Sequence, residues 1–245
     1  MNIITRHLIL LFLLLCSFQT DLCADPKTHL KDNLRSAKPG DYIVTAQSKS
    51  FTVLHIYEKN GDTLTVEEIS APSVKLRLPT GSWKEWVLNG APQHTSWVRY
   101  DIDLPTGIVK RFCTFSRNGW FETGQGDNFM STLLNLRLEP IPLKERKRVG
   151  PPPSDGTPEW RSYWQPKMIF EGHEIKNVTF NALRTRWPKD GSDLSGKTIE
   201  IYIPEENDKY PSYFPYWLQI NGMVGKAKIR IIDSGSNLRD CATLK

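Results

Sequence analysis

The side chains that most often carry chemistry, histidine and cysteine, are few and scattered in this sequence. After residue 24 the histidines are His29, His55, His94 and His173. None of them has a second His or Cys at a spacing typical of metal ligands. The Walker, G-x-S-x-G and H-E-x-x-H motifs are absent too. The sequence therefore predicts no metal site, no cofactor and no catalytic residue.

Two weaker arrangements could still support hydrolysis. His94-Thr95-Ser96 places a base beside two hydroxyls, but adjacent residues rarely present their side chains to each other, and a catalytic triad is defined by geometry. We interpret this segment as a turn that leads into a strand. Cys113 has no identified histidine partner, so we interpret it as a buried small side chain or half of a disulfide.

Tryptophans give a stronger signal. Trp83, Trp86 and Trp97 fall in one segment, and Trp97 and Trp217 each lie on the opposite strand face from their apolar neighbours. Core packing is the first interpretation, because large aromatic side chains are usually mostly buried. The alternative is a ligand pocket with aromatic walls. Its predicted lining residues are Trp83, Trp86, Trp97, Phe129, Leu133 and Trp217.

A basic run occupies the start of a proline-rich insert at residues 144–166. Its cations are Lys144, Arg146, Lys147 and Arg148. A solvated loop is the simpler interpretation, and a contact with anionic lipid head groups or an acidic envelope partner is the other. The insert is either a linker or an ordered crossing loop, and Trp160 and Trp164 favour the ordered loop. The net charge of +5 is too small to indicate nucleic-acid binding.

The first residues are typical of a cleavable secretory signal. Arg6 precedes an apolar run from Leu8 to Cys16, and a small residue follows at Ala24. The run is too short to span a bilayer. We therefore expect a signal peptide at residues 1–24 and a mature protein in the periplasm or cell envelope, with secretion as the alternative. Cleavage would leave Cys113 and Cys241, and export permits a disulfide between them, although their spacing alone decides nothing.

The rest of the sequence predicts one β-rich domain over residues 25–245, with the proline-rich insert as a candidate subdomain boundary. Apolar residues recur with helical spacing at 25–38 and at 127–136, where the stripe is wide enough to be buried. Alternating segments and turn residues predict strands at 41–47, 51–58, 64–69, 96–104, 108–116, 168–170, 178–184, 198–204, 214–220 and 227–233. This is a mainly β (α+β) fold: a curved antiparallel sheet or half-barrel with an N-terminal helix and one buried apolar helix.

Two resemblances to known protein families add further expectations. Residues 214–220, followed by 228–235, resemble the last hairpin of the half-barrel periplasmic lipoprotein carriers and related lipid-binding proteins. That likeness implies an apolar groove for a lipid or acyl chain, although the proline-rich insert departs from the carrier pattern. Residues 90–97 and 146–153 resemble exported proteins of the chlamydial group that have no assigned function. That second likeness implies no activity.

The leading hypothesis is therefore an exported periplasmic or envelope binding protein for a lipid or acyl ligand, and not an enzyme. A rival hypothesis is an envelope protein–protein interaction or structural module. A hydrolase without a recognisable motif is the third, and a nucleic-acid partner is not expected.

Overall fold

A computed structural model describes residues 28–74, 82–116, 119–123, 128–221 and 226–238. Strands dominate it, which confirms the mainly β fold. In chain order they are β1 (Thr28–His29), β2 (Tyr42–Gln47), β3 (Ser50–Asn60), β4 (Thr63–Pro72), β5 (Ser96–Asp103), β6 (Ile108–Ser116), β7 (Gly119–Thr123), β8 (Arg137–Pro140), β9 (Met168–Phe170), β10 (His173–Ile175), β11 (Phe180–Arg186), β12 (Thr198–Pro204), β13 (Trp217–Asn221) and β14 (Lys226–Gly235).

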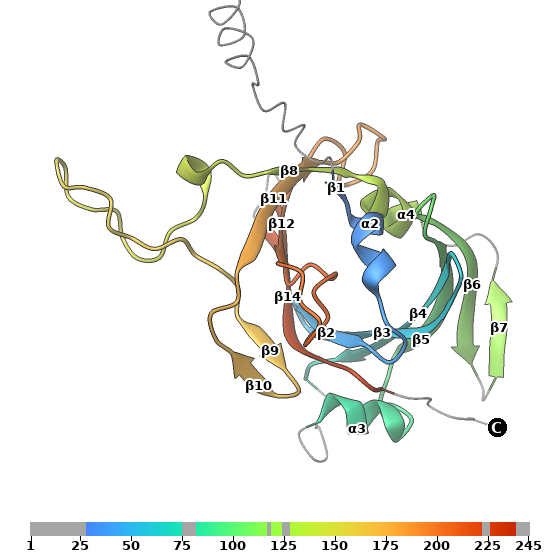
Figure 1. Cartoon of the computed structure of the whole chain (residues 1–245). Coiled ribbons are helices and arrows are strands. Elements are labelled where there is room, and N and C mark those ends of the chain that lie inside the picture. Colours follow the sequence, from blue (N-terminus) through green and yellow to red (C-terminus); the bar gives the residue numbers. More distant parts are fainter. Residues whose placement is uncertain (1–27, 75–81, 117–118, 124–127, 222–225, 239–245) are drawn as a thin grey trace, which may run out of the picture.

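Twelve of these strands form one antiparallel sheet, in the order β1-β8-β11-β12-β13-β14-β2-β3-β4-β5-β6-β7. The sheet curves around a central space without closing, since its two edges, β1 and β7, are not paired with each other in the described chain (Figure 1). The predicted curved antiparallel sheet is thus confirmed. β9 and β10 form a separate hairpin.

Strict alternation gives the sheet a buried inner face and a second apolar layer outside. On β5, Val98, Tyr100 and Ile102 belong to the inner core. Trp97 instead joins a smaller outer cluster that includes Tyr42 and Val53. Because side chains alternate across a strand, residues of opposite parity must lie on opposite faces. The curved sheet therefore packs one hydrophobic core against its inner face and a second, smaller one against its outer face.

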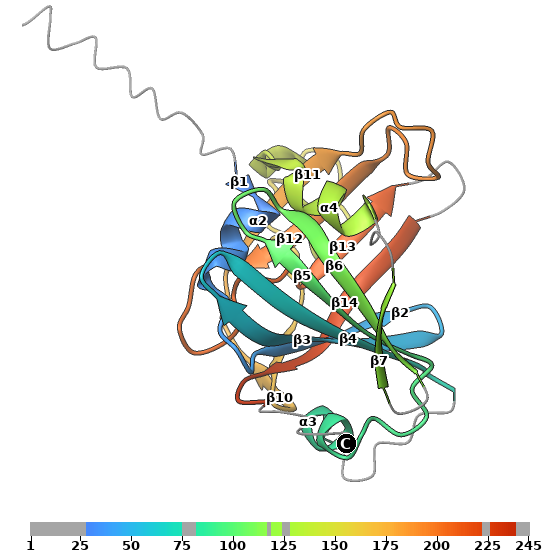
Figure 2. The same cartoon turned by 90° about the vertical axis from the view of Figure 1, so that its right-hand side faces the viewer.

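Two helical segments occupy the inside of the curve (Figure 1). The first is α2 (Leu30–Asn33), which continues as the 3-10 turn η1 (Leu34–Ser36) and buries Leu30 and Leu34. It is shorter than the helix predicted at 25–38, whose first residues lie outside the described part. The second is α4 (Asn128–Asn135), which packs beside β6 at the open side of the sheet (Figure 2).

A third helix, α3 (Trp83–Leu88), covers the outer face. Its N-cap is Ser82, whose side chain accepts a hydrogen bond from the backbone N–H of Glu85. Trp83, Trp86 and Val87 are buried against the sheet. α3 therefore supplies the second apolar layer that Trp97 requires.

The proline-rich insert is an ordered loop after the 3-10 turn η2 (Leu143–Glu145). We call residues 147–164 the arm, because they project from the body of the molecule (Figure 1). Its two sides pair: Val149 N–H donates to Ser162, and Trp164 N–H donates to Lys147. The ordered-loop interpretation thus describes the insert better than a linker. No helix in the described residues is long and apolar enough to cross a membrane.

Candidate functional site

An apolar pocket lies between α4 and the inner face of the sheet, with a volume of about 240 Å³. Strands β2 to β5 form one wall, and α2, α4 and residues around Phe214 close it. The lining residues are Leu30, Leu34, Ile43, Thr45, Gln47, Thr52, Leu54, Val66, Glu68, Tyr100, Ile102, Phe129, Met130, Leu133, Leu134, Tyr213, Phe214, Pro215, Leu218 and Ile229.

A second space of about 190 Å³ adjoins it and extends toward β6. It shares Glu68, Tyr100, Phe129 and Met130 with the apolar pocket and adds Val109 and Phe112. Each volume alone is below the about 300 Å³ at which typical small-molecule sites begin, so the apolar pocket suits a slender ligand.

The helices line the apolar pocket because their apolar residues recur three and four positions apart and so share one helix face. In α4, Phe129, Met130, Leu133 and Leu134 recur at three and four residues, so they share the face that looks onto the sheet. In the segment α2–η1, Leu30 and Leu34 stand one turn apart and close the opposite side. Phe129 is held by a stacked contact with Trp187, 5.3 Å between ring centroids.

Polar side chains gather at one end of the apolar pocket, on the inner face of β2, β3 and β4. Thr45 pairs with Thr52 across β2–β3, and Thr52 pairs with Ser70 across β3–β4. The hydroxyls of Thr52 and Ser70 are 2.9 Å apart, and the Thr45 hydroxyl donates to the Thr52 carbonyl over 3.3 Å. Glu68 lies one row deeper, opposite Leu54. The apolar pocket therefore has one polar end.

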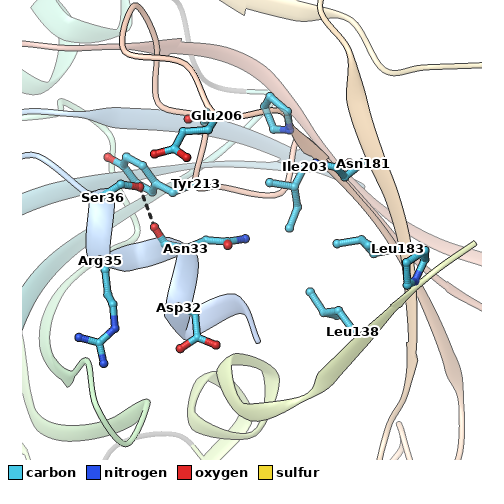
Figure 3. A pocket seen from close by; sticks show the side chains of 13 residues that line it. Asp32, Asn33, Arg35, Ser36, Leu138, Asn181, Leu183, Ile203, Glu206 and Tyr213 are labelled. Atoms are coloured by element: carbon cyan, nitrogen blue, oxygen red, sulfur yellow. Dashed lines mark hydrogen bonds between the residues drawn. The ribbon is translucent and has the colours of Figure 1, made fainter. Parts of the chain in front are cut away.

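A larger cavity of about 520 Å³ lies on the other side of α2. Figure 3 shows a polar side made by Asp32, Asn33 and Ser36, facing aliphatic side chains of Leu138, Leu183 and Ile203. The Ser36 hydroxyl donates to the Asn33 carbonyl over 2.8 Å. Tyr213 lines both this cavity and the apolar pocket. α2 thus separates a cavity of mixed polar and aliphatic lining from the apolar pocket.

The six predicted ligand-binding residues do not converge. Phe129 and Leu133 line the apolar pocket, and ligand binding by them stays a prediction. Trp83, Trp86 and Trp97 pack in the outer cluster on the other face of the sheet. One groove lined by all of these residues is therefore wrong, because α3 buries the three tryptophans where they cannot reach the inner pocket.

Trp217 also lies away from the pocket. Its ring centroid is 4.9 Å from that of Trp164 in the arm, and the Lys228 Nζ lies 5.5 Å from its ring. Trp164 contacts Tyr202 as well, at 5.1 Å. Trp217 thus helps to attach the arm to the outer face of β12 and β13.

The basic run divides into two parts. The Lys147 Nζ lies 2.5 Å from Glu200, and Arg148 donates to the Arg161 carbonyl over 2.7 Å. Arg146 donates from Nε to the Ile141 carbonyl over 3.0 Å. Lys144 is exposed. Three of the four cations thus contact their own chain, and a contact with an anionic surface stays a prediction.

The residues considered for hydrolysis have other contacts. His94 Nδ1 lies 3.0 Å from the Ala91 carbonyl, and the Thr95 hydroxyl donates to the Ser70 carbonyl over 3.2 Å. Cys113 lies on β6, half-buried, opposite Arg99 and Glu122. Cys241 lies outside the described residues, so the bridge stays a prediction. Among the described residues no group of three His, Cys, Asp or Glu side chains could hold a metal ion.

A buried network of ionisable side chains lies on the outer face of the sheet. Glu67, fully buried, lies 3.2 Å from His55 Nδ1 and 2.8 Å from Arg99. His55 Nε2 lies 2.8 Å from the Leu238 carbonyl. Burial alone would raise the pKa of Glu67, but the hydrogen bond from His55 and the charge of Arg99 outweigh it and lower the pKa. This network connects the backbone at Leu238 to the outer face of the sheet.

Comparison with known proteins identifies the family. A family model described as CT021 protein matches residues 52–176, just over half of the chain. The chain belongs to the CT021 protein family. The matched residues include Thr52, Glu68, Phe129 and Leu133 of the apolar pocket.

The CT021 family also has a solved structure with this fold. The hypothetical protein CT021 from Chlamydia trachomatis matches with a TM-score of 0.60, over 86% of this chain and 93% of that chain, at 21% identity. The predicted likeness to chlamydial proteins is thus confirmed, whereas the likeness to lipoprotein carriers stays a prediction. No curated protein matches the chain.

Sequence reasoning missed Glu68 and Tyr100 as pocket residues. Glu68 has the same strand parity as Leu64 and Val66, which belong to the inner core. A carboxylate at an inward position of a predicted strand is a recognisable signal, since charged side chains are uncommon on the core face of a sheet.

Proposed function

We propose that this protein is an exported binding protein of the periplasm or cell envelope that holds one acyl chain in the apolar pocket. The observation that carries the proposal is the pocket itself: most of its lining residues are Leu, Ile, Val, Met or Phe, and its polar groups gather at one end. Export rests on the signal-like residues 1–24, which lie outside the described part.

The size and lining favour a single alkyl chain. Burying one methylene is worth about 0.8 kcal/mol, so a chain that enters the pocket gains affinity along its length. The pocket and its neighbour together lie at the small end of ligand sites, which suits one chain better than two.

A pocket-filling variant tests the proposal. Val66 lines the pocket and is 4% exposed, so Val66→Phe adds bulk where the chain would lie. Val149→Phe makes the same change at a residue that is 50% exposed on the arm. After delipidation, we expect Val66→Phe to lower affinity for a fluorescent acyl probe at least about tenfold, whereas Val149→Phe binds like the wild type. Thermal unfolding checks that both variants fold.

Native mass spectrometry of gently purified wild-type protein gives an independent result. A co-purifying species of lipid mass supports the proposal. If no such species appears and acyl probes do not bind the wild type, the proposal is wrong.

One observation favours a second function, docking to an envelope protein. Trp160 is 70% exposed on the arm, and tryptophan is enriched among residues that dominate protein interfaces. Cross-linking in cells, compared between the wild type and Trp160→Ala, tests this role: a stoichiometric partner that the variant loses supports docking.

A further inference from the structure

We call the cavity of about 520 Å³ beside α2 the mixed cavity, because it has a polar side and an aliphatic side (Figure 3). Its volume lies within the range of about 300 to 1,000 Å³ that is typical of small-molecule sites, and it is larger than the apolar pocket. The proposed binding of one acyl chain in the apolar pocket gives the mixed cavity no role.

Helical geometry directs polar side chains of the segment α2–η1 into the mixed cavity. Leu30 and Leu34 line the apolar pocket, so residues on the other side of the same segment face away from that pocket. Asn33 and Ser36 lie on that other side and line the mixed cavity (Figure 3). The Ser36 hydroxyl donates to the Asn33 carbonyl over 2.8 Å, which stabilises this turn.

Strand register forms the opposite wall of the mixed cavity. Asn181 on β11 lies directly opposite Ile203 on β12, and Leu183 on β11 lies opposite Pro140 on β8. Residues that are directly opposite each other, or two positions apart on one strand, share a face of the sheet. This wall is therefore aliphatic, with the amide of Asn181 beside it.

The loop after β12 adds a carboxylate, that of Glu206, to the lining of the mixed cavity. Hydrogen bonds within the loop hold its shape: the Ser212 hydroxyl accepts from the Asn207 N–H over 3.1 Å and donates to the Asn207 carbonyl over 3.3 Å. Glu206 and Asn181 are both exposed. A ligand can therefore reach these two polar groups from solvent.

The polar groups of the mixed cavity match hydroxyl groups best. The amides of Asn33 and Asn181 both donate and accept hydrogen bonds, whereas the carboxylate of Glu206 only accepts. A hydroxyl donates and accepts, so it can pair with all three side chains. An ammonium only donates, so it would leave the amide N–H groups without a partner.

The charges of the lining disfavour an anionic ligand. The ionisable side chains among the described lining residues are the carboxylates of Asp32 and Glu206 and the guanidinium of Arg35. Arg35 already lies 4.0 Å from the carboxylate of Asp62. A phosphate or carboxylate in the cavity would therefore meet two like charges, which is unfavourable.

We propose that the mixed cavity binds a neutral sugar in its pyranose form. A pyranose ring has an apolar C–H face and carries hydroxyls around its edge, so it matches a site with one aliphatic and one polar side. The C–H face packs against Leu138, Leu183 and Ile203. The hydroxyls bond to Asn33, Asn181 and Glu206. This second site goes beyond acyl binding and does not depend on it.

Saturation-transfer difference NMR tests the proposal, because it detects weak ligands. The probes are the methyl pyranosides of glucose, mannose, galactose and N-acetylglucosamine, each at about 10 mM, which would fill most of a site with a Kd of about 1 mM. We expect transfer from the wild-type protein to at least one of these sugars, strongest at ring C–H protons. Spermidine, the cationic comparison, should show no transfer.

Glu206→Ala tests whether the sugar lies in the mixed cavity. A hydrogen bond to a charged group is strong enough that its loss should weaken binding at least about tenfold and abolish the transfer. Glu205→Ala is the matched control, because Glu205 is the neighbouring exposed glutamate and does not line the cavity. It should leave the transfer unchanged. Asn181→Ala, on the opposite wall, should weaken binding independently, and thermal unfolding checks that all variants fold.

Three results would overturn the proposal. The first is no transfer to any of the four sugars, with or without transfer to spermidine. The second is transfer that persists in both Glu206→Ala and Asn181→Ala, and the third is transfer that Glu205→Ala also abolishes. The mixed cavity and the apolar pocket lie on opposite sides of α2, so failure of sugar binding leaves acyl binding to its own test.

Discussion

Single residues on the outer face show how this fold tolerates buried charge. Glu67 is 0% exposed, and its two oxygens contact His55 and Arg99, which come from the neighbouring strands. A buried carboxylate is costly unless it is paired and hydrogen-bonded. The strand register supplies both partners, because His55 and Arg99 lie directly opposite Glu67 on β3 and β5.

Glu67→Gln should therefore lower the free energy of unfolding by about 3–5 kcal/mol at pH 7, since it removes one partner of a buried ionic group. Urea denaturation measures the loss. Glu174→Gln is the control: Glu174 pairs with Lys176 on the surface, and exposed pairs contribute little. A loss no larger than that of the control would contradict the structural role of Glu67.

The same residue predicts a pH dependence. The pKa of Glu67 is lower in the folded protein than its ordinary value of 4.5. A carboxyl with a lowered folded pKa adds stability above its unfolded pKa and loses it as pH falls through the folded pKa. Stability of the wild type should thus fall below about pH 4.5 more steeply than that of Glu67→Gln. Parallel pH profiles would contradict this assignment.

At the scale of elements, alternating apolar residues predicted the strands well. Helical spacing of apolar residues predicted the helices less well. The strand at residues 108–116 is observed with those bounds, and the apolar stripe at 127–136 corresponds to α4. α3 was missed, although Ser82-Trp83-Lys84-Glu85 has the S-x-x-E pattern of a capping box. The tryptophans of that segment suggested a pocket wall because their helical spacing was not recognised.

Pocket residues were predictable only in part for a related reason. Phe129 and Leu133 follow from the stripe of α4 alone. The strand order that places β14 beside β2 does not follow from local pattern, because pairing between distant strands depends on the whole chain. The face on which Trp97 is buried depends on α3, so it could not be assigned before that helix was known.

The arm allows a test at this scale. Trp164 contacts Tyr202 and Trp217 at its base, whereas Trp160 is exposed elsewhere on the arm. Trp164→Ala should destabilise the protein by about 3 kcal/mol, and Trp160→Ala by less than about 0.5 kcal/mol. Chemical denaturation compares them, and limited proteolysis should cut the arm faster only in Trp164→Ala. Equal stability of the two variants would mean that the arm is not attached through Trp164.

For the whole molecule, the open sheet has a cavity of mixed lining and an apolar pocket on either side of α2, and a second hydrophobic core on its outer face. The described chain ends within that outer core: Leu238 is 1% exposed and its N–H donates to the Gly40 carbonyl over 2.8 Å. The contact from His55 to Leu238 therefore brings the last described residue onto the outer face of β3.

Cys113 lies in the same register row as His55, so the predicted disulfide to Cys241 is a question about this outer face. Cys113 lies three strands from His55 in one register row, which is about 14 Å at the usual strand spacing.

If the protein is exported as proposed, cleavage at Ala24 would leave two cysteines in an oxidising compartment, and we expect them to form this bridge. Intact mass should rise by two alkyl groups only when reduction precedes alkylation. Cys113→Ser should then lose about 2–4 kcal/mol of stability in oxidising buffer, and reductant should abolish its difference from the wild type. Two thiols that alkylate without reduction would contradict the bridge and leave the contact between His55 and Leu238 as a purely non-covalent one.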